Sequence, residues 1–373
     1  MKIYTQPCIL MKPASGNCNM RCDYCFYCDE QENRKQKLFG MMEEQTLRNL
    51  IRKAFVGAEG SVSIAFQGGE PTLRGIEFYY KAVEYVKHYN KKNLPVTYAF
   101  QTNGTNIDED WCRLFQECGF LVGISMDGTW KTHNRYRHFK NGKDTFETVM
   151  EGIQLLEKHQ IPYNVLTVVH NETVAHVNEI YKFYNKKNIE YQQYIPCLDP
   201  LQKDRGVMVY SLNPESYGEF LIRLFKKWEE DVKKKHMVYI RQFDNYVGIL
   251  KGHNPEACDQ RGCCGIQYVV EADGSVYPCD FYMLDPYYLG NVNENSFKEM
   301  DQARQKLCFM EESLKISEDC LNCRYLPLCR GGCQRNRVKQ EDGTYKNYFC
   351  KSYRIFFDEC ADELVQIAAS TDL

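Results

Sequence analysis

The sequence predicts an α/β protein in which a partial (β/α)6 barrel is followed by a small, cysteine-rich domain with a β-hairpin. Two observations lead to this fold class. Short apolar segments alternate with helix-like patterns over the first two thirds of the 373 residues, which is the rhythm of βα units around a parallel sheet. That rhythm stops after a predicted helix at about Pro214–Lys235, and eleven cysteines follow between Cys258 and Cys360. We therefore expect domains at residues 1–235 and 236–373.

Each expected strand is a short run rich in apolar and β-branched residues. The predicted strands are Cys8–Lys12, Val62–Phe66, Val96–Phe100, Leu121–Ser125, Tyr163–Val169 and Tyr191–Ile195. Between them, apolar residues recur at helical spacing, for example at Leu47, Leu50, Ile51 and Phe55. Six βα units are too few to close an eight-stranded barrel, so we expect an open, curved sheet. Ligands in such sheets bind at the carboxyl ends of the strands.

The C-terminal region carries one clear local signal. Two short apolar runs, Tyr268–Glu271 and Ser275–Tyr277, flank the dipeptide Asp273-Gly274. Asp-Gly between apolar runs is typical of a hairpin with a type I′ turn. We therefore expect a β-hairpin closed by this turn.

Composition excludes several classes of protein. The formal net charge is -3, and no long basic block gives the electrostatic footprint of a nucleic-acid-binding protein. No apolar run in the sequence approaches the roughly 20 residues that a membrane-spanning helix requires. The chain has 19 cysteines and opens without a secretory pattern. We expect a cytoplasmic protein whose cysteines serve metal binding or catalysis rather than disulfides.

The most informative motif is formed by Cys18, Cys22 and Cys25. A [4Fe-4S] cubane normally takes four cysteine ligands. Three thiolates at these spacings hold three corners and leave one iron open to an external chelating molecule. Zinc binding or disulfide formation is the alternative, and a structural zinc site is closed by four ligands.

The C-terminal cysteines also fit cluster ligation. Eight of them are the candidate cluster ligands: Cys258, Cys264, Cys279, Cys320, Cys323, Cys329, Cys333 and Cys350. Eight thiolates suffice for two fully ligated cubanes, although two zinc ribbons would use the same number. Cys263 lies beside Cys264, so either could be the ligand. We expect the other cysteines to be small buried apolar residues, namely Cys8, Cys28, Cys112, Cys118, Cys197, Cys263, Cys308 and Cys360.

The C-x3-C-x2-C motif resembles the signature of the radical S-adenosylmethionine enzymes, and the C-terminal spacing resembles the SPASM extension of their peptide-modifying members. Over nearly its whole length the chain most resembles the anaerobic sulfatase-maturating enzymes. The segments that carry this resemblance are Lys12-Pro13-Ala14-Ser15, Cys22-Asp23-Tyr24-Cys25-Phe26-Tyr27, Phe66-Gln67-Gly68-Gly69-Glu70-Pro71-Thr72, Gln101-Thr102-Asn103-Gly104-Thr105, Ser125-Met126-Asp127-Gly128, Cys197-Leu198-Asp199-Pro200-Leu201 and Asp273–Tyr282.

The resemblance implies S-adenosylmethionine and three [4Fe-4S] clusters as cofactors, the first cluster held by Cys18, Cys22 and Cys25. The implied ligands of the first auxiliary cluster are Cys258, Cys264, Cys279 and Cys333, and those of the second are Cys320, Cys323, Cys329 and Cys350. The implied contacts to S-adenosylmethionine are Tyr24, Gly69, Ser125, Arg137 and Leu198. Asp280, next to Cys279, aligns with the family's proposed catalytic base; without the resemblance a helix cap would be the simpler interpretation.

The implied activity is the anaerobic oxidation of a Cys or Ser to Cα-formylglycine in an unfolded sulfatase polypeptide with a Cys/Ser-x-Pro-x-Arg motif. The implied electron donor is a flavodoxin or ferredoxin. Two alternatives are a SPASM enzyme that forms a thioether or carbon-carbon crosslink in a ribosomal peptide, and a non-catalytic zinc-ribbon module.

Overall fold

The computed structural model describes residues 5–371 as a mixed α/β protein with two compact units. The first unit contains the chain up to Ser125 together with Tyr136–Tyr163 and Ile266–Cys308. The second contains Met126–Arg135, Asn164–Gly265 and the chain from Phe309 onward. Each unit is defined by packing and combines several separate segments of the chain. The domain boundary expected after residue 235 is a different kind of division and stays a prediction from sequence.

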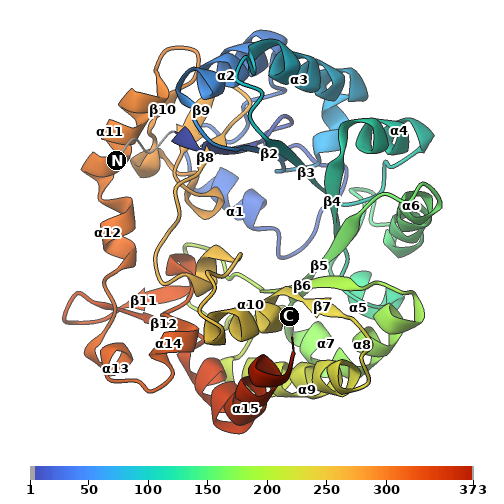
Figure 1. Ribbon diagram of the computed structural model, residues 1–373, viewed down its shortest axis with the longest axis vertical. Coiled ribbons are helices and arrows are strands. Elements are labelled where there is room, and N and C mark those ends of the chain that lie inside the picture. The colour runs from blue at the N-terminus through green and yellow to red at the C-terminus, as the bar shows by residue number, and fades with distance from the viewer. Residues whose placement is uncertain (1–4, 372–373) are drawn as a thin grey trace. The chain divides into compact units, whose positions relative to one another are not determined.

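The first unit carries a run of parallel strands in the chain order that the sequence predicts (Figure 1). These are β1 (Cys8–Met11), β2 (Val62–Phe66), β3 (Val96–Thr102) and β4 (Phe120–Ser125). The helices of this unit are α1 (Phe26–Glu32), α2 (Glu44–Gly57), α3 (Ile76–Tyr89), α4 (Glu109–Cys118), α6 (Phe146–Lys158) and α11 (Phe297–Leu307). The predicted βα rhythm is confirmed, and the carboxyl ends of β1 to β4 all point to one edge of the sheet.

Local signals set the limits of these helices, and α4 shows how. The Asp108 carboxylate accepts hydrogen bonds from the backbone N–H groups of Asp110 and Trp111, which caps the amino end of the helix. Gly119 ends the helix with a left-handed φ of 68°. The next residue, Phe120, begins β4.

Aromatic packing forms the core under β2, β3 and β4. The rings of Phe66 and Tyr79 lie 5.0 Å apart, and those of Phe100 and Phe115 lie 5.1 Å apart. Phe100 is fully buried between the sheet and the helices α3 and α4. Fully burying one such side chain contributes about 1.5–3 kcal/mol. This cluster therefore fixes the strand ends on which the site depends.

The predicted C-terminal hairpin is confirmed, but the predicted turn type is wrong. β8 (Tyr268–Val270) pairs with β1 in parallel and with β9 (Ser275–Tyr277) in antiparallel orientation, and β10 (Gly290–Asn291) continues the sheet. The Gly274 N–H donates to the Glu271 carbonyl at 2.9 Å, and Gly274 has a φ of 91°. Asp273 is not among the residues with positive φ, which a type I′ turn requires at both central positions.

The second unit contains a shorter parallel run, β5 (Tyr163–Val169), β6 (Tyr191–Pro196) and β7 (Tyr239–Ile240), and a small hairpin, β11 (Arg337–Lys339) and β12 (Tyr345–Asn347). Its helices are α5 (Trp130–His133), α7 (Asn171–Ala175), α8 (Val177–Lys186), α9 (Pro214–Lys233), α10 (Arg241–Leu250), α12 (Phe309–Ser313), α13 (Glu318–Leu321), α14 (Leu326–Cys329) and α15 (Cys350–Ser370). The long helices α9 and α15 pack through Phe225 and Phe356, whose rings lie 5.7 Å apart. Gly218 permits the approach, because a Cβ there would lie 3.0 Å from Ile355.

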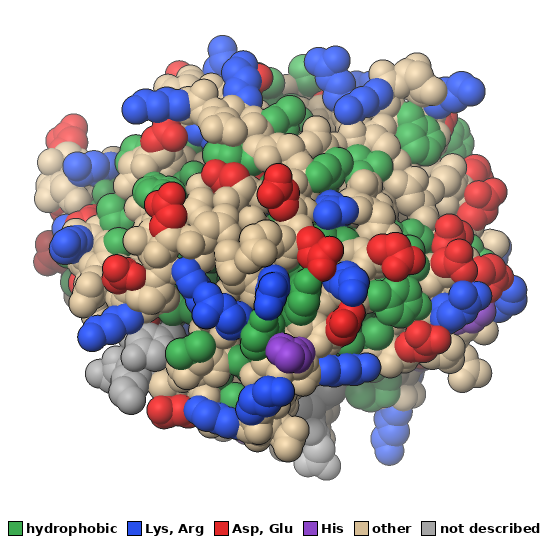
Figure 2. Space-filling view, turned by 90° about the horizontal axis from the view of Figure 1, so that it is seen from above, with side chains coloured by type: hydrophobic (Ala, Val, Ile, Leu, Met, Phe, Trp, Pro, Cys, Tyr) green, Lys and Arg blue, Asp and Glu red, His purple; other side chains and the backbone are tan. Residues whose placement is uncertain are grey.

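The surface contributes less to stability than this core. On the face shown in Figure 2, acidic and basic side chains are interspersed. Exposed ion pairs of the chain, such as Lys81–Glu84 at 2.9 Å, contribute little, because solvent and salt screen them. Within residues 5–371, no helix combines the length and the apolar character needed to cross a membrane.

Candidate active site and metal centres

The three-cysteine loop is tied to the ends of two strands. Glu70, which follows β2, donates its N–H to the Asn17 carbonyl at 2.7 Å. Asn103, which follows β3, donates from Nδ2 to Asn19 Oδ1 at 2.8 Å and to the Cys18 sulfur at 3.7 Å. These contacts hold the loop at the carboxyl edge of the sheet, where the sequence predicts the ligands to bind.

The predicted ligands of the first cluster lie together in this loop. Cys18, Cys22 and Cys25 interact electrostatically with Cys28, which therefore lies in the same group of thiols. A hydrogen bond from the Cys28 thiol lowers the pKa of Cys25 to about 6, which favours the thiolate that binds iron. Burial raises the pKa of Cys18 to about 11. The donor set fits a cubane, and the role of each cysteine as a ligand stays a prediction.

The Gly68-Gly69-Glu70 segment packs directly against the same loop. Gly69 has a φ of 52°, and a Cβ there would lie 2.1 Å from the Asn17 carbonyl oxygen. Glu70 is fully buried and accepts hydrogen bonds from the Asn103 N–H at 2.8 Å and the Thr102 hydroxyl at 2.8 Å. Burial raises the pKa of Glu70. Glu70 thus joins the ends of β2 and β3, a role that sequence reasoning did not assign to it.

The residues predicted to contact S-adenosylmethionine lie in both units. In the first unit, the Arg137 guanidinium lies 5.3 Å from the centre of the Tyr24 ring, and Gln101 donates to the Ser125 hydroxyl at 3.2 Å. In the second unit, Leu198 is half-buried just after β6. Their contacts with the cofactor remain predictions.

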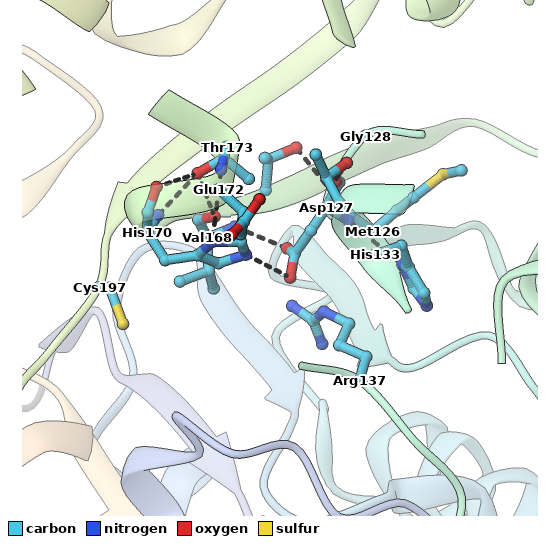
Figure 3. Close-up of polar contacts among 12 residues, drawn as sticks. Met126, Asp127, Gly128, His133, Arg137, Val168, His170, Glu172, Thr173 and Cys197 are labelled. Atoms are coloured by element: carbon cyan, nitrogen blue, oxygen red, sulfur yellow. Dashed lines mark hydrogen bonds and ion pairs between the residues drawn. The ribbon is translucent and has the colours of Figure 1, made fainter. Parts of the chain in front are cut away.

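A buried polar cluster of the second unit fixes the segment after β4 (Figure 3). One oxygen of the Asp127 carboxylate accepts from the Val168 N–H at 2.9 Å, and the other lies 3.6 Å from His170 Nε2. The Asp127 N–H donates to His133 Nδ1 at 3.3 Å. Sequence reasoning noted the Met126-Asp127-Gly128 motif after the strand but did not foresee this anchoring role.

Asp280 is held in a compact hydrogen-bonded group of the first unit. The Tyr27 hydroxyl donates to Asp280 Oδ2 at 2.6 Å, and Gln67 Nε2 donates to the same oxygen at 2.9 Å. Asp280 is 7% exposed, and its Oδ1 accepts no hydrogen bond from residues 5–371. Burial raises the pKa of its carboxyl group. Two donors therefore hold Oδ2 in place, while Oδ1 has no hydrogen-bond donor among the described residues.

Two further buried ionisable side chains, not foreseen from the sequence, interact electrostatically with Asp280. Lys12 is 2% exposed; its Nζ donates to the Met283 sulfur at 3.1 Å and lies 4.2 Å from the centre of the Tyr27 ring. Glu30 is 3% exposed, and burial raises its pKa to about 8. The burial of Lys12 could have been predicted from its position at the end of an apolar strand, where a solvent-exposed charge is not expected.

The predicted ligands of the second auxiliary cluster line one pocket of the second unit. Its lining includes Cys320, Cys323, Cys329 and Cys350 together with Tyr325, Tyr353 and Arg354. Within residues 5–371, no three His, Cys, Asp or Glu side chains gather tightly enough to hold a single metal ion. A cubane has its irons at separate corners, so its cysteine ligands lie farther apart than the ligands of a single metal ion. Four thiols around one pocket fit such a group.

The predicted ligands of the first auxiliary cluster divide between the units. Cys333 interacts electrostatically with Cys258 and Cys264 in the second unit, and this favours Cys264 over Cys263 as the ligand. Cys279 belongs to the first unit. All four assignments stay predictions.

The other cysteines follow the expectation only in part. Cys112, Cys197 and Cys360 are buried, as expected. Cys8, Cys28 and Cys308 are exposed, so the prediction of burial is wrong for them. Cys8 and Cys308 lie at the edges of elements, at the start of β1 and just after α11, where a thiol reaches solvent without loss of packing.

Comparison with known proteins agrees with this arrangement. Residues 13–184 match the Radical SAM superfamily, and residues 262–324 match SPASM, an iron-sulfur cluster-binding domain. The parallel α/β fold and the cysteine groups therefore define the class: a radical S-adenosylmethionine protein with a cysteine-rich SPASM extension.

Full-length relatives narrow this class. The chain is 46% identical to a cysteine-type anaerobic sulfatase-maturating enzyme of Clostridium novyi over 96% of each chain. It is 30% identical to a serine-type anaerobic sulfatase-maturating enzyme of Bacteroides thetaiotaomicron, over 95% of this chain and 89% of the relative. The solved structure of native anSMEcpe with bound AdoMet and Cp18Cys peptide superposes with a TM-score of 0.92 at 42% identity, covering 98% of this chain and 99% of that one. The chain belongs to the family of anaerobic sulfatase-maturating enzymes.

Proposed function

We propose that the protein oxidises a cysteine or serine of an unfolded sulfatase polypeptide to Cα-formylglycine under anaerobic conditions and thereby activates the sulfatase. The observation that carries the proposal is the Asp280 carboxylate. It directly follows the predicted ligand Cys279, is oriented by Tyr27 and Gln67, and keeps Oδ1 without a hydrogen bond from the described part of the chain. Membership of the family supports the same reaction.

The chain's own residues position the substrate and move its proton. When bound, S-adenosylmethionine and the clusters would supply the radical chemistry that abstracts a hydrogen atom and an acceptor for the second electron. Asp280 takes the proton of the thiol or hydroxyl group through Oδ1, while Tyr27 and Gln67 hold Oδ2 in place. A thioaldehyde formed from cysteine then hydrolyses to the aldehyde with release of hydrogen sulfide. Serine gives the aldehyde directly.

The cofactors would be held by the residues that the sequence indicates. Cys18, Cys22 and Cys25 hold the first cluster, and the pocket lined by Cys320, Cys323, Cys329 and Cys350 holds the second auxiliary cluster. For the first auxiliary cluster we assign Cys258, Cys264, Cys279 and Cys333. Tyr24, Gly69, Ser125, Arg137 and Leu198 contact S-adenosylmethionine.

The substrate and partners follow from the same proposal. Higher identity to the cysteine-type relative than to the serine-type relative supports cysteine as the preferred target. The polypeptide carries a Cys/Ser-x-Pro-x-Arg motif, and a flavodoxin or ferredoxin supplies the electron that starts the reaction. We place the protein in the cytoplasm, because thiolates that hold iron-sulfur clusters need a reducing compartment.

Incubation with synthetic peptides tests the proposal. The reconstituted protein is incubated anaerobically with S-adenosylmethionine, a reductant and a Cys-x-Pro-x-Arg or Ser-x-Pro-x-Arg peptide. The cysteine peptide should become lighter by about 18 Da, from loss of two hydrogens and exchange of sulfur for oxygen. A loss of about 2 Da with sulfur retained would overturn the proposal in favour of thioether crosslinking.

A further inference from the structure

Arg304 is a buried cation in the last turn of α11 that the proposed reaction does not use. Its side chain is 2% exposed, and Nη2 donates to the Gln267 carbonyl at 2.6 Å. The guanidinium lies 5.0 Å from the centre of the Tyr268 ring. Nε is 3.8 Å from the Asp301 carboxylate, beyond hydrogen-bond distance, and Nη1 has no hydrogen-bond acceptor within residues 5–371. A buried charge with unused donors is costly to a fold and calls for an explanation.

The strand register places Cys279 close to this cation. β8 and β9 pair with Val269 opposite Tyr277 and Val270 opposite Val276. The pairing ends at Val269 and Tyr277, so Gln267, whose carbonyl holds the guanidinium, and Cys279 each lie two residues beyond the same end of the paired segment. Within this unit, α11 follows β10, the edge strand next to β9 and β8, and contacts it (Figure 1). The charge of Arg304 also interacts electrostatically with the Cys279 thiol.

The neighbouring Asp301 forms only a loose ion pair with Arg304. Oδ1 of Asp301, the oxygen that faces Arg304, also accepts a hydrogen bond of 2.7 Å from the Tyr268 hydroxyl. The ion pair with Arg304 is long, at 3.8 Å. An arginine side chain does not lose its proton in proteins, so the positive charge persists at every working pH.

We propose that Arg304 is a positioning residue whose fixed charge beside Cys279 raises the reduction potential of the first auxiliary cluster. The proposal rests on the proposed function, in which this cluster accepts the second electron from the substrate. Net charge and hydrogen bonds to the sulfurs are among the factors that set the potential of a [4Fe-4S] cluster. Reduction adds one electron and therefore one negative charge to the cluster, and a nearby cation stabilises that reduced state. Arg304 thus favours transfer of the electron away from the substrate, after Asp280 has taken the proton.

A redox titration of the full chain tests this role. The background carries Cys18→Ala, Cys22→Ala and Cys25→Ala, so that only the two auxiliary clusters are titrated, and their reduction is followed by electron paramagnetic resonance. Arg304→Gln should lower the equilibrium constant for reduction of one cluster at least tenfold, a shift of about 59 mV for one electron. The other cluster should keep its potential. Arg304→Lys keeps the charge and should stay within about threefold of the parent.

Lys306→Gln is the matched control, because it removes the same charge from an exposed position of the same helix. It should leave both potentials unchanged, since solvent and salt screen exposed charges. Unchanged potentials in Arg304→Gln, or an equal shift in Arg304→Lys, would overturn the proposal. If Arg304→Gln loses four irons while Arg304→Lys keeps them, the charge is needed to retain the cluster rather than to set its potential, and the proposal fails. If both variants lose iron, the role of Arg304 is structural and the proposal fails.

Two further measurements separate this inference from the proposed function. Cys279→Ala should abolish the potential that Arg304→Gln shifts; a Cys279→Ala protein with both potentials intact would overturn the assignment of Cys279 and this inference with it. The peptide assay is independent of the titration. Absence of formylglycine together with a shifted potential would reject the proposed function and support the effect of Arg304.

Discussion

The hydroxyl of Tyr27 lies 2.6 Å from Oδ2 of Asp280, although 253 residues separate the two in the chain. Tyr27 comes two residues after Cys25, and Asp280 comes one residue after Cys279. The neighbouring rings of Phe26 and Phe281 lie 4.9 Å apart and reinforce the contact. The proposed base therefore lies where a segment of the first cluster loop meets a segment of the auxiliary-cluster region, within one compact unit.

Asp280→Asn should separate the chemistry from cofactor binding. The substitution keeps the size of the side chain and removes its basicity. We expect the variant to retain all three clusters and to cleave S-adenosylmethionine, but to form formylglycine at least about a hundredfold more slowly, since a general base contributes about 10² to 10⁴-fold. Iron content, 5′-deoxyadenosine and product mass are measured together. Product formation near the parent rate would make Asp280 a structural cap, and loss of iron would make it a cluster support.

Replacing Cys18, Cys22 and Cys25 together by Ala should remove about four of about twelve irons. No thiolate of the C-x3-C-x2-C motif would remain to hold the cubane, so cleavage of S-adenosylmethionine should stop. Iron analysis and quantification of 5′-deoxyadenosine give the result. The matched control is a triple replacement of Cys112, Cys197 and Cys360, which are buried outside the proposed clusters and should keep the iron content. Radical chemistry that survives in the first variant would contradict the assignment.

Gly69→Ala should disturb the cluster loop. Alanine at a φ of 52° is strained, and its Cβ would lie 2.1 Å from the backbone oxygen of Asn17. Gly119→Ala is the matched control, because Gly119 also has a positive φ of 68° but has no atom within 4 Å of the added Cβ. Both variants should lose about 1–2 kcal/mol from backbone strain. Only Gly69→Ala should also lose cofactor cleavage, measured as 5′-deoxyadenosine; equal activity in the two variants would contradict the close packing.

The buried carboxyl group of Glu30 should make the free energy of unfolding depend on pH. Burial raises its pKa from 4.5 to about 8, so between these values the folded protein holds a proton that the unfolded chain has released. The contribution of Glu30 to stability is therefore complete below pH 4.5 and is lost as the pH rises towards 8. Glu30→Gln cannot ionise. From pH 5 to pH 8 its stability relative to the parent should improve by at least about 1.4 kcal/mol, the equivalent of one pKa unit.

Thermal unfolding of the cluster-loaded parent and Glu30→Gln proteins, side by side at each pH, measures this difference. The pH dependence of the clusters themselves then cancels in the comparison. A constant difference between the two proteins across the range would show that Glu30 does not titrate abnormally in the folded state.

Apolar runs bounded by turn signals predicted the strands well, because burial on a parallel sheet selects such runs. The prediction for β3 stopped at Phe100, yet the strand continues through the polar residues Gln101 and Thr102, which still pair with β4. The hairpin was predicted correctly, but the type of its turn was not, because Asp-Gly suits more than one kind of tight turn. Local sequence patterns also do not show which ionisable side chains are buried, so the burial of Lys12 and Glu30 was not predicted. Their burial depends on Asp280 and Met283, more than 200 residues away in the chain.

The pairing of β1 with β8 has a consequence for how the protein is made. Ile9 lies opposite Tyr268, so one edge of β1 has no sheet partner until about 260 further residues have left the ribosome. At roughly 5–20 residues per second this takes on the order of ten to fifty seconds. During that interval the nascent chain exposes an apolar strand edge and lacks the segment that carries Cys279 and Asp280. Completion of the active site therefore follows synthesis of the C-terminal third, and the auxiliary clusters cannot be fully ligated before the chain has been made through Cys350.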